Sequence, residues 1–266
     1  MESRSDSHWE RFHRHWDRLT PPLRPPRDVV EAIGAALGAK AGNILMLGVT
    51  PELSTLGDSL TAVDSSLAMI EHIWPGDRAD RRAIQANWLD LPFDDATLSA
   101  VIGDGSCICL RFADQYERLF GELFRVLAPG GRAVIRLYST PSPCETLASV
   151  QAAGMNRQAR TVHALRFRVA MAWCAQHGEP NVPMSTIGDE FMKCFPDRKA
   201  LASINDWEPE DIAIIDAYAA SDAVYSFPTA EQVVDLVRQT FNDVHLLPSG
   251  NYELAEHCPL LVIDKP

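Results

Sequence analysis

The sequence lacks the features that mark membrane, secreted and metal-binding proteins. Its longest apolar stretches, 44–49 and 260–263, are far too short to span a bilayer, and the charged segment 1–18 holds no hydrophobic signal core. The six cysteines are scattered without a C-x-x-C pair, which argues against a zinc site and against a disulfide framework. We therefore expect a cytoplasmic protein with reduced cysteines and no membrane contact.

Dense runs of basic residues are missing as well. The 266 residues include 36 acidic and 24 basic side chains, which leaves a net charge of −12. A phosphate backbone would be repelled by the average field, so nucleic acid is not expected as a partner. A hydrophobic content of 46% and a charged content of 23% are ordinary for a globular protein.

Two short apolar runs have the layout of an α/β nucleotide site. The run 43–47 ends in the turn 47–53 (Leu-Gly-Val-Thr-Pro-Glu-Leu), and the run 60–63 ends at Asp64. Such sites bring backbone close to the ligand at the first turn and place an acceptor for ribose hydroxyls at the second.

Glycine is scarce at the first turn, and this limits the ligand. A pyrophosphate needs several glycines and free backbone N–H groups, whereas Gly48 stands alone. Thr50 is predicted to cap a helix that has Pro51 at its first position, and Glu52 adds negative charge at the mouth. The turn therefore favours a ligand with ribose and adenine but without phosphate.

Strand-like and helical segments alternate through the first half of the chain. Because the strand-like runs are apolar on both faces, they favour a parallel sheet covered by helices. The proline-rich segment 21–26 is expected to be extended, and Pro129-Gly130-Gly131 to end a helix. Strands are predicted at 43–48, 60–63, 83–86, 98–103 and 132–138, with helices at 7–18, 29–37, 65–73 and 113–127.

From Ser142 the pattern becomes helical for about eighty residues. Ser142-Pro143-Cys144-Glu145 has capping-box spacing with proline at the first helical position. Further helices are predicted at 159–177, 185–195, 208–221 and 229–240, followed by strands at 243–248 and 259–263.

These elements predict an α/β fold with a Rossmann-like, seven-stranded, mostly parallel sheet, helices on both faces and a last strand that runs antiparallel. A helical insertion after strand five would lie above the edge of the sheet where ligands bind, which makes it a candidate lid. The expected parts are an N-terminal helical cap (1–40), the cofactor-binding core (41–141), the insertion (142–228) and the last helix and strands (229–266).

Over about residues 40–138 the chain resembles the class I S-adenosylmethionine-dependent methyltransferases. No single motif is decisive, and the resemblance rests on the order and spacing of five segments. They are Leu47-Gly48, Val63-Asp64, Asn-Trp-Leu-Asp-Leu-Pro-Phe at 87–93, Val-Ile-Gly-Asp-Gly-Ser at 101–106 and Arg-Val-Leu-Ala-Pro-Gly-Gly at 125–131. The resemblance implies S-adenosylmethionine as the cofactor.

It also implies roles for particular residues. Gly48 would let the methionyl part of the cofactor pass, and Asp64, in a pattern with Ser65 and Met69, would accept both ribose hydroxyls. The stretch that flanks adenine corresponds to Asn87, Trp88 and Leu89, and the stretch that faces the amino-acid part and the sulfonium corresponds to Asp104, Gly105 and Ser106.

Two further cofactor contacts are suggested by position rather than by a motif. Thr50 lies within the first turn, and Arg24 stands in a rigid proline frame ahead of the fold. A guanidinium held in this way could clamp the cofactor carboxylate through two hydrogen bonds.

Each assignment has a structural alternative. Asp64 could cap a helix, Trp88 could cover the core, Arg24 could form a surface ion pair, Asp104 could belong to an Asp-Gly turn, and Tyr138 could close the core. His8, His13 and His15 fit a solvated helix face, so no metal site is expected. Most aromatic residues of the insertion are expected in its core, with one or two lining the pocket: Trp173, Trp207, Tyr218 and Tyr225.

Three functions remain open. The first is methyl transfer to a small molecule, mainly by positioning, because no convincing general base is visible. The second is cyclisation of the cofactor to azetidine-2-carboxylate and methylthioadenosine, because the segments 16–25 and 47–53 also resemble a bacterial subgroup that includes S-adenosylmethionine cyclases. The third is cofactor binding without catalysis. Candidates to accept a proton are Asp104, Ser106, Tyr138, Ser203 and Asn205, of which Asp104, Tyr138 and Ser203 are the predicted catalytic residues.

Overall fold

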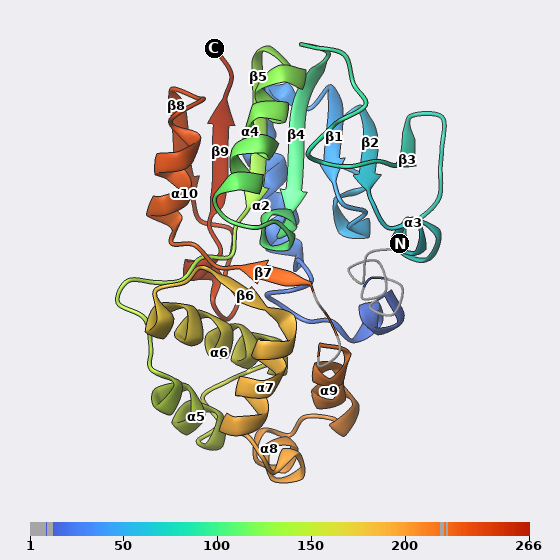
Figure 1. The fold of residues 1–266 in the computed structure, drawn as a ribbon. Helices are drawn as coiled ribbons and strands as arrows, with labels where there is room; N and C mark the ends of the chain where they lie inside the picture. Colours follow the sequence, from blue (N-terminus) through green and yellow to red (C-terminus); the bar gives the residue numbers. More distant parts are fainter. Residues whose placement is uncertain (1–8, 10–12, 219–220, 222) are drawn as a thin grey trace.

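The chain folds into a sheet flanked by helices and a separate layer of helices below one edge of the sheet (Figure 1). The computed structural model describes residues 9, 13–218, 221 and 223–266. The two parts meet where the parallel strands end, so this boundary is where a ligand site is expected.

The sheet confirms the predicted fold class. Its seven strands lie in the order β3-β2-β1-β4-β5-β9-β8, and β9 runs antiparallel to both of its neighbours while the first five strands are parallel. The bounds are β1 (Asn43–Leu47), β2 (Ser59–Asp64), β3 (Arg81–Gln85), β4 (Leu98–Asp104), β5 (Leu127–Arg136), β8 (Asp243–Leu247) and β9 (Leu260–Asp264).

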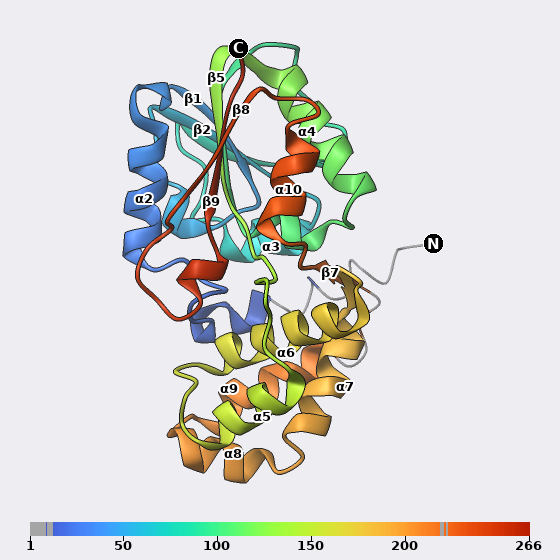
Figure 2. The ribbon, with the colours of Figure 1, turned by 90° about the vertical axis from the view of Figure 1, so that its left-hand side faces the viewer.

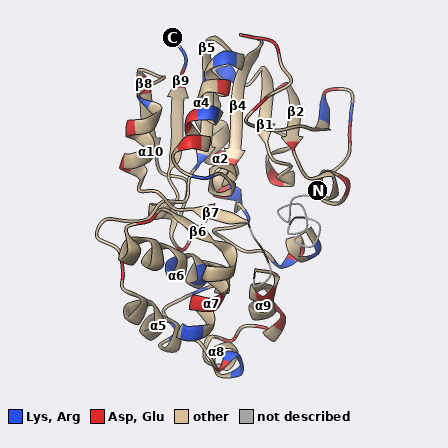
Figure 3. Cartoon of the chain, viewed as in Figure 1, with Lys and Arg blue, Asp and Glu red and all other residues tan. Residues whose placement is uncertain are grey.

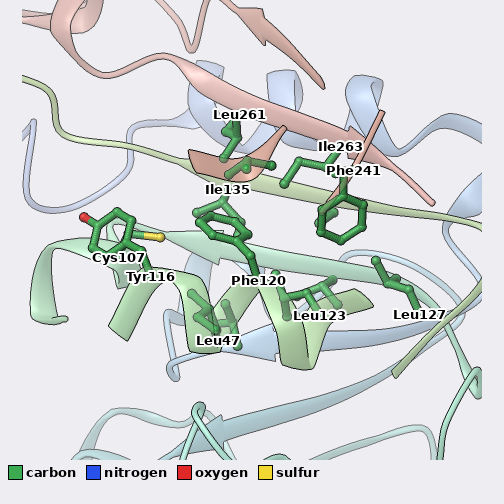
Figure 4. Packing of buried hydrophobic residues seen from close by; sticks show 14 of the residues in the cluster. Leu47, Cys107, Tyr116, Phe120, Leu123, Leu127, Ile135, Phe241, Leu261 and Ile263 are labelled. Atoms are coloured by element: carbon green, nitrogen blue, oxygen red, sulfur yellow. The ribbon is translucent and has the colours of Figure 1, made fainter. Parts of the chain in front are cut away.

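Helices cover both faces of the sheet (Figure 2). On one face α2 (Arg27–Leu37) and α3 (Leu67–Ile73) contribute to one buried cluster, and on the other α4 (Asp114–Val126) and α10 (Ala230–Val237) contribute to a second. Figure 4 shows side chains of α4 packed against those of β5 and β9. The N-terminal cap was predicted over 1–40, but α2 packs on a face of the sheet. The described segment that covers the edge of the sheet is therefore 13–26.

The apolar strands explain why both faces are covered. In β1, Leu45 and Leu47 belong to the cluster beneath α4, whereas Ile44 and Met46 belong to the cluster beneath α2, as the alternation of side chains along a strand requires. Both β1 and β4 are uncharged until the final Asp104 of β4, and charged side chains lie mainly on helices and loops (Figure 3).

The insertion lies between β5 and α10. It contains α5 (Leu147–Met155), α6 (Val162–His177), α7 (Met184–Cys194), α8 (Arg198–Asn205) and α9 (Pro209–Ala213), and an antiparallel pair, β6 (Asn181–Pro183) and β7 (Val224–Ser226), lies between these helices and the sheet. Where the insertion begins and ends, Thr140 donates from its backbone to Pro228 O (3.1 Å) and from its side chain to Phe227 O (2.7 Å). No helix in the described part of the chain is long and apolar enough to cross a membrane.

Short 3-10 helices complete the structure. They are η1 (His13–Arg18), η2 (Gly38–Lys40), η3 (Pro51–Leu53), η4 (Ser106–Cys109), η5 (Ile214–Ala217) and η6 (Ala255–His257). Where a helix was predicted over 7–18, the described portion is η1, and residues 1–8 and 10–12 lie outside the described residues.

Several predicted boundaries are wrong. The capping box at 142–145 begins no helix, because α5 starts at Leu147 and is capped by Thr146, whose side chain accepts from Ser149 N. Pro129-Gly130-Gly131 does not end α4, which stops at Val126 where the chain turns directly into β5. The elements α8, β6 and β7 were not predicted, and the helix expected over 208–221 is the short α9 followed by η5.

Candidate functional site

A cavity lies at the edge of the sheet where β1, β2 and β4 end. Strand ends, the N-terminal segment and the insertion contribute its walls. Nine of the predicted site residues line it: Gly48, Thr50, Asp64, Met69, Trp88, Asp104, Gly105, Ser106 and Tyr138.

One carbonyl oxygen organises the part of the cavity beside β1 and β2. Val63 O accepts from Gly48 N at 2.8 Å and from Trp88 Nε1 at 2.6 Å, which brings the first turn, the end of β2 and the indole together. Gly48 has φ of +94°, and a Cβ there would lie 3.9 Å from the Trp88 ring and 4.0 Å from Asp64 Oδ2. The glycine thus keeps open the space between the indole and the carboxylate.

Asp64 is held so that one oxygen remains for a ligand. Its Oδ1 accepts from Ser66 N at 2.8 Å, and its Oδ2 faces the Gly48 turn. Ser66, not Asp64, caps α3 by accepting from Met69 N, so the helix-cap alternative for Asp64 is wrong. Burial raises the Asp64 pKa to about 6, although the backbone N–H groups of Ser66 and Ser65 oppose the rise.

The turn after β4 is tightly packed beneath Tyr138. Gly105 adopts φ of +63°, and a Cβ at this position would lie 2.4 Å from the Tyr138 ring, so only glycine fits. Ser106 lines the cavity, and its buried Oγ has no hydrogen-bond partner within the described residues. A buried hydroxyl in this state is an available contact for a polar ligand.

Asp104 and Tyr138 belong to a buried network centred on Arg136. Arg136 Nε donates to Asp104 Oδ1 at 2.5 Å, and the two side chains are 0% and 2% exposed. The remaining guanidinium nitrogens donate to Tyr252 OH (2.9 Å), Tyr138 OH (2.9 Å) and Pro22 O (2.7 Å), and Tyr138 OH also donates to Pro22 O.

This network fixes the protonation states of its members. Burial disfavours the charged form of Arg136, but the neighbouring carboxylate raises the Arg136 pKa well above its ordinary value. Burial also raises the Tyr138 pKa well above its ordinary value, so Tyr138 stays protonated at neutral pH. Neither Asp104 nor Tyr138 is therefore arranged as a free general base.

The N-terminal segment roofs the cavity. Trp16, Leu19 and Leu23 line it, as does Trp9. Arg24 does not: its guanidinium forms an ion pair with Glu52, donates to Trp16 O at 3.3 Å, and so is not placed to clamp a cofactor carboxylate as expected. Thr50 lines the cavity but makes no capping hydrogen bond, because only the single turn η3 follows it.

Four other predicted residues do not line the cavity. Ser65 is exposed beyond the end of β2, Asn87 is exposed and accepts from Leu89 N at 3.0 Å, and Leu89 packs against the core cluster beneath α4. Ser203 is exposed on α8, which lies at the end of the insertion distant from the sheet (Figure 1). This position removes the basis for its predicted catalytic role.

Sequence reasoning missed much of the wall. Leu47, Val49, Ile108 and Cys109 come from strand ends and η4. Tyr225, by contrast, is one of the insertion aromatics of which one or two were expected to line the pocket. A signal existed for Arg136, because an arginine in the apolar run 133–138 requires a buried partner. No comparable signal marks the N-terminal roof.

These groups suit the cofactor implied by the sequence. The free Asp64 oxygen can accept ribose hydroxyls, the space above Gly48 can pass a methionyl chain, and the Ser106 hydroxyl is available to its amino-acid part. In the described part of the chain, no group of three or more His, Cys, Asp or Glu side chains could hold a metal ion.

Comparisons with known proteins agree with this picture. Residues 48–135 match a family described as a methyltransferase domain. The chain is 48% identical over 61 residues to the demethylmenaquinone methyltransferase of Thermus thermophilus, a match over 23% of this chain and 26% of that protein. The chain thus spans about a quarter of the length of this relative.

Solved structures share the fold at low sequence identity. The N-methyltransferase NodS of Bradyrhizobium japonicum WM9 with S-adenosyl-L-homocysteine has a TM-score of 0.54 and 13% identity over 99% of this chain and 100% of that one. The DhpI–SAH complex has 0.54 and 14% over 99% and 95%. A protein described as a putative Zn-dependent alcohol dehydrogenase from Rhodobacter sphaeroides has 0.61 and 12% over 100% and 99%, so these similarities show the fold alone.

The matched domain covers the first turn, Asp64 and the strands that frame the cavity. Residues 48–135 are thus similar to a methyltransferase domain, and the cofactor that this similarity supports is S-adenosylmethionine.

Proposed function

We propose that the protein transfers the methyl group of S-adenosylmethionine to a small molecule. The observation that carries this proposal is the cavity itself, which is roofed by the N-terminal segment and bounded by Tyr225 of the insertion. A cavity covered by such a roof suits a metabolite rather than a macromolecular acceptor.

The sheet side of the cavity would bind the cofactor. Asp64 accepts the ribose hydroxyls through its free oxygen, Trp88 lies against the adenine end, and the Gly48 turn leaves room for the methionyl chain. Met69 closes this part of the wall with an apolar side chain, and Ser106 offers its unpaired hydroxyl to the amino-acid part.

The remaining walls would orient the acceptor and exclude water. Tyr138 and Tyr225, with Trp16 from the roof, present aromatic side chains to a site that holds a cationic sulfonium, and aromatic rings attract such a cation. Excluding water and aligning the reactants can supply about 7 kcal/mol or more of the barrier reduction.

The bound cofactor supplies a methyl group whose bond to sulfur breaks, the electron pair going to sulfur, as a lone pair of the acceptor takes the methyl carbon. Asp104 and Tyr138 are committed to Arg136, so neither of them is a free base. An acceptor that is already deprotonated, or that loses its proton to water, therefore fits this site best.

Incubation with methyl-labelled S-adenosylmethionine tests the proposal. Extract from the source organism would be filtered to separate small molecules from macromolecules, and each fraction would be incubated with the protein and with Asp64→Ala. We expect label in the small-molecule fraction, formed by the native protein and much more slowly by the variant. Label confined to the macromolecular fraction would overturn the assignment of a small acceptor.

Cyclisation of the cofactor remains the second hypothesis, and the same incubation without acceptor separates it from methyl transfer. A methyltransferase yields no appreciable product from S-adenosylmethionine alone. Equal amounts of methylthioadenosine and a four-carbon imino acid under these conditions would replace methyl transfer by intramolecular attack of the amine.

A further inference from the structure

A second chamber opens beside the cofactor cavity. It shares Trp9, Cys109 and Tyr225 with the cavity. Its other walls include Arg111, which precedes α4, Gln115 in the first turn of α4, and Val224 of β7. A molecule in this chamber therefore lies against the same side chains that bound the cofactor cavity.

The chamber presents hydrogen-bond donors and a positive charge. Gln115 Oε1 accepts from Arg111 N at 2.8 Å, which leaves the amide nitrogen of Gln115 as its free donor. The exposed Arg111 guanidinium has no ion-pair partner within the described residues, and no described carboxylate lines the chamber. These two donors suit an anionic group.

A second cation lies behind the shared wall. The Arg166 guanidinium is 4.2 Å from the centroid of the Tyr218 ring, and Tyr218 meets Tyr225 edge to face at 6.1 Å. Arg166 is 2% exposed, and its Nη2 has no hydrogen-bond partner among the residues described. Since no described counter-ion cancels this charge, its positive field adds to that of Arg111.

The acidic groups of the site lie elsewhere. Asp64 and Asp104 line the cofactor cavity but not the chamber, and Asp104 is neutralised by Arg136. The site is therefore divided by charge: carboxylates lie beside the expected ribose and methionyl parts, and cations lie beside the chamber.

We propose that this chamber holds the methyl acceptor, and that the acceptor is a small organic anion whose carboxylate, or a comparable group, pairs with Arg111 and Gln115. Its apolar body lies against Trp9, Val224 and Tyr225, which directs the reacting atom toward the wall shared with the cofactor. This inference rests on the proposed methyltransferase function and adds the chemical class of the substrate.

The test compares two probes of equal size and different charge, benzoate and benzamide. Each is titrated by NMR into protein saturated with S-adenosylhomocysteine, for the native chain, Arg111→Gln and the matched control Arg118→Gln, which removes an exposed arginine elsewhere on α4. We expect the native chain and the control to prefer benzoate by about tenfold, as for one partly screened charge-assisted contact, and Arg111→Gln to lose this preference.

Three results would overturn the inference. They are equal affinity of the native chain for the two probes, a preference lost equally in both variants, and loss of S-adenosylhomocysteine binding in Arg111→Gln, which would assign Arg111 to the cofactor. Failure of the native protein to bind S-adenosylhomocysteine is a separate outcome, because it removes the proposed function itself.

Discussion

The cavity has two sides that are built differently. On the sheet side, Gly48, Asp64 and Trp88 are placed by adjacent strand ends and by the carbonyl of Val63. On the cover side, the N-terminal segment contributes Trp16 and Leu19 while the insertion contributes Tyr225, about 200 residues further along the chain. Backbone hydrogen bonds fix the first side, and side-chain packing fixes the second.

The two buried arginines express the same difference. Arg136, on β5, is satisfied by Asp104, two tyrosines and the carbonyl of Pro22. Arg166, on α6, has aromatic contacts but no counter-ion among the described residues. The buried arginine of the sheet side is therefore fully paired, whereas that of the cover side has no counter-ion among the described residues.

The largest expected effect follows from Arg136→Met. This change leaves Asp104 buried without its counter-ion and releases Pro22 O, so we expect the free energy of unfolding to fall by about 3–5 kcal/mol. Urea titration measures the change. Arg132→Met, which breaks a partly exposed pair with Asp264 on the same strand, is the control and should cost about 1 kcal/mol or less. Equal losses of unfolding free energy in the two variants would mean that Arg136 does not hold the N-terminal segment to the sheet through Pro22 O and Asp104.

Asp64→Ala should weaken cofactor binding on the sheet side of the cavity, and it should lower the free energy of unfolding less than Arg136→Met does. Loss of two charge-assisted hydrogen bonds of about 1.5 kcal/mol each predicts affinity for S-adenosylhomocysteine about 100-fold lower, measured by calorimetry. Asp58→Ala, an exposed aspartate just before β2, serves as the control. Unchanged affinity in Asp64→Ala would refute the ribose assignment.

Cofactor affinity should depend on pH through Asp64. Its pKa of about 6 is raised by burial, and the ionised form accepts the ribose hydroxyls, so affinity should fall about tenfold for each pH unit below 6 and be flat above. Stability of the free protein should change in the opposite sense: the contribution of the raised pKa is present at low pH and lost as pH rises through 6. Asp64→Asn should remove both dependences, and a pH profile identical to the native one would contradict the assignment.

The smallest expected change in the free energy of unfolding follows from Arg166→Met, on the cover side of the cavity. Removing a buried charge without a described counter-ion should leave the free energy of unfolding unchanged or raise it by about 1 kcal/mol, because the lost cation–π contact offsets part of the gain. Arg168→Met, on the same helix, breaks the pair with Glu145 and should be neutral or destabilising. Thermal unfolding compares the two. Strong destabilisation by Arg166→Met would show that Arg166 serves structure alone.

The sheet could be predicted from sequence because its signals are local. Each strand is a short apolar run, and Gly48 and Asp64 stand directly at strand ends, so hydrophobic pattern and turn chemistry place them together. The seven strands and the antiparallel last strand follow from the same pattern. Only boundaries shifted, as where the chain passes from α4 into β5 without the break expected at Pro129.

The cover could not be predicted because its contacts join distant segments. Arg24 looked available in the sequence, but its partner Glu52 is 28 residues away and its pairing depends on the folded roof. The sequence does not place α8 relative to the sheet, so it could not test the role predicted for Ser203. Arg166 lies on a largely buried helix that has no periodic signal. Long-range side-chain pairing of this kind leaves no trace in local periodicity.

The hydrogen bonds from Thr140 to Phe227 and Pro228 have a consequence for how such proteins diversify. The more than eighty residues between them leave and rejoin the sheet at adjacent points, so for the strands they are equivalent to a tight loop. The cost of closing a loop grows only slowly with its length. A different helical module could therefore be grafted at this junction, exchanging Tyr225 and its surroundings while the register of every strand and the Asp64 side of the cavity stay as they are.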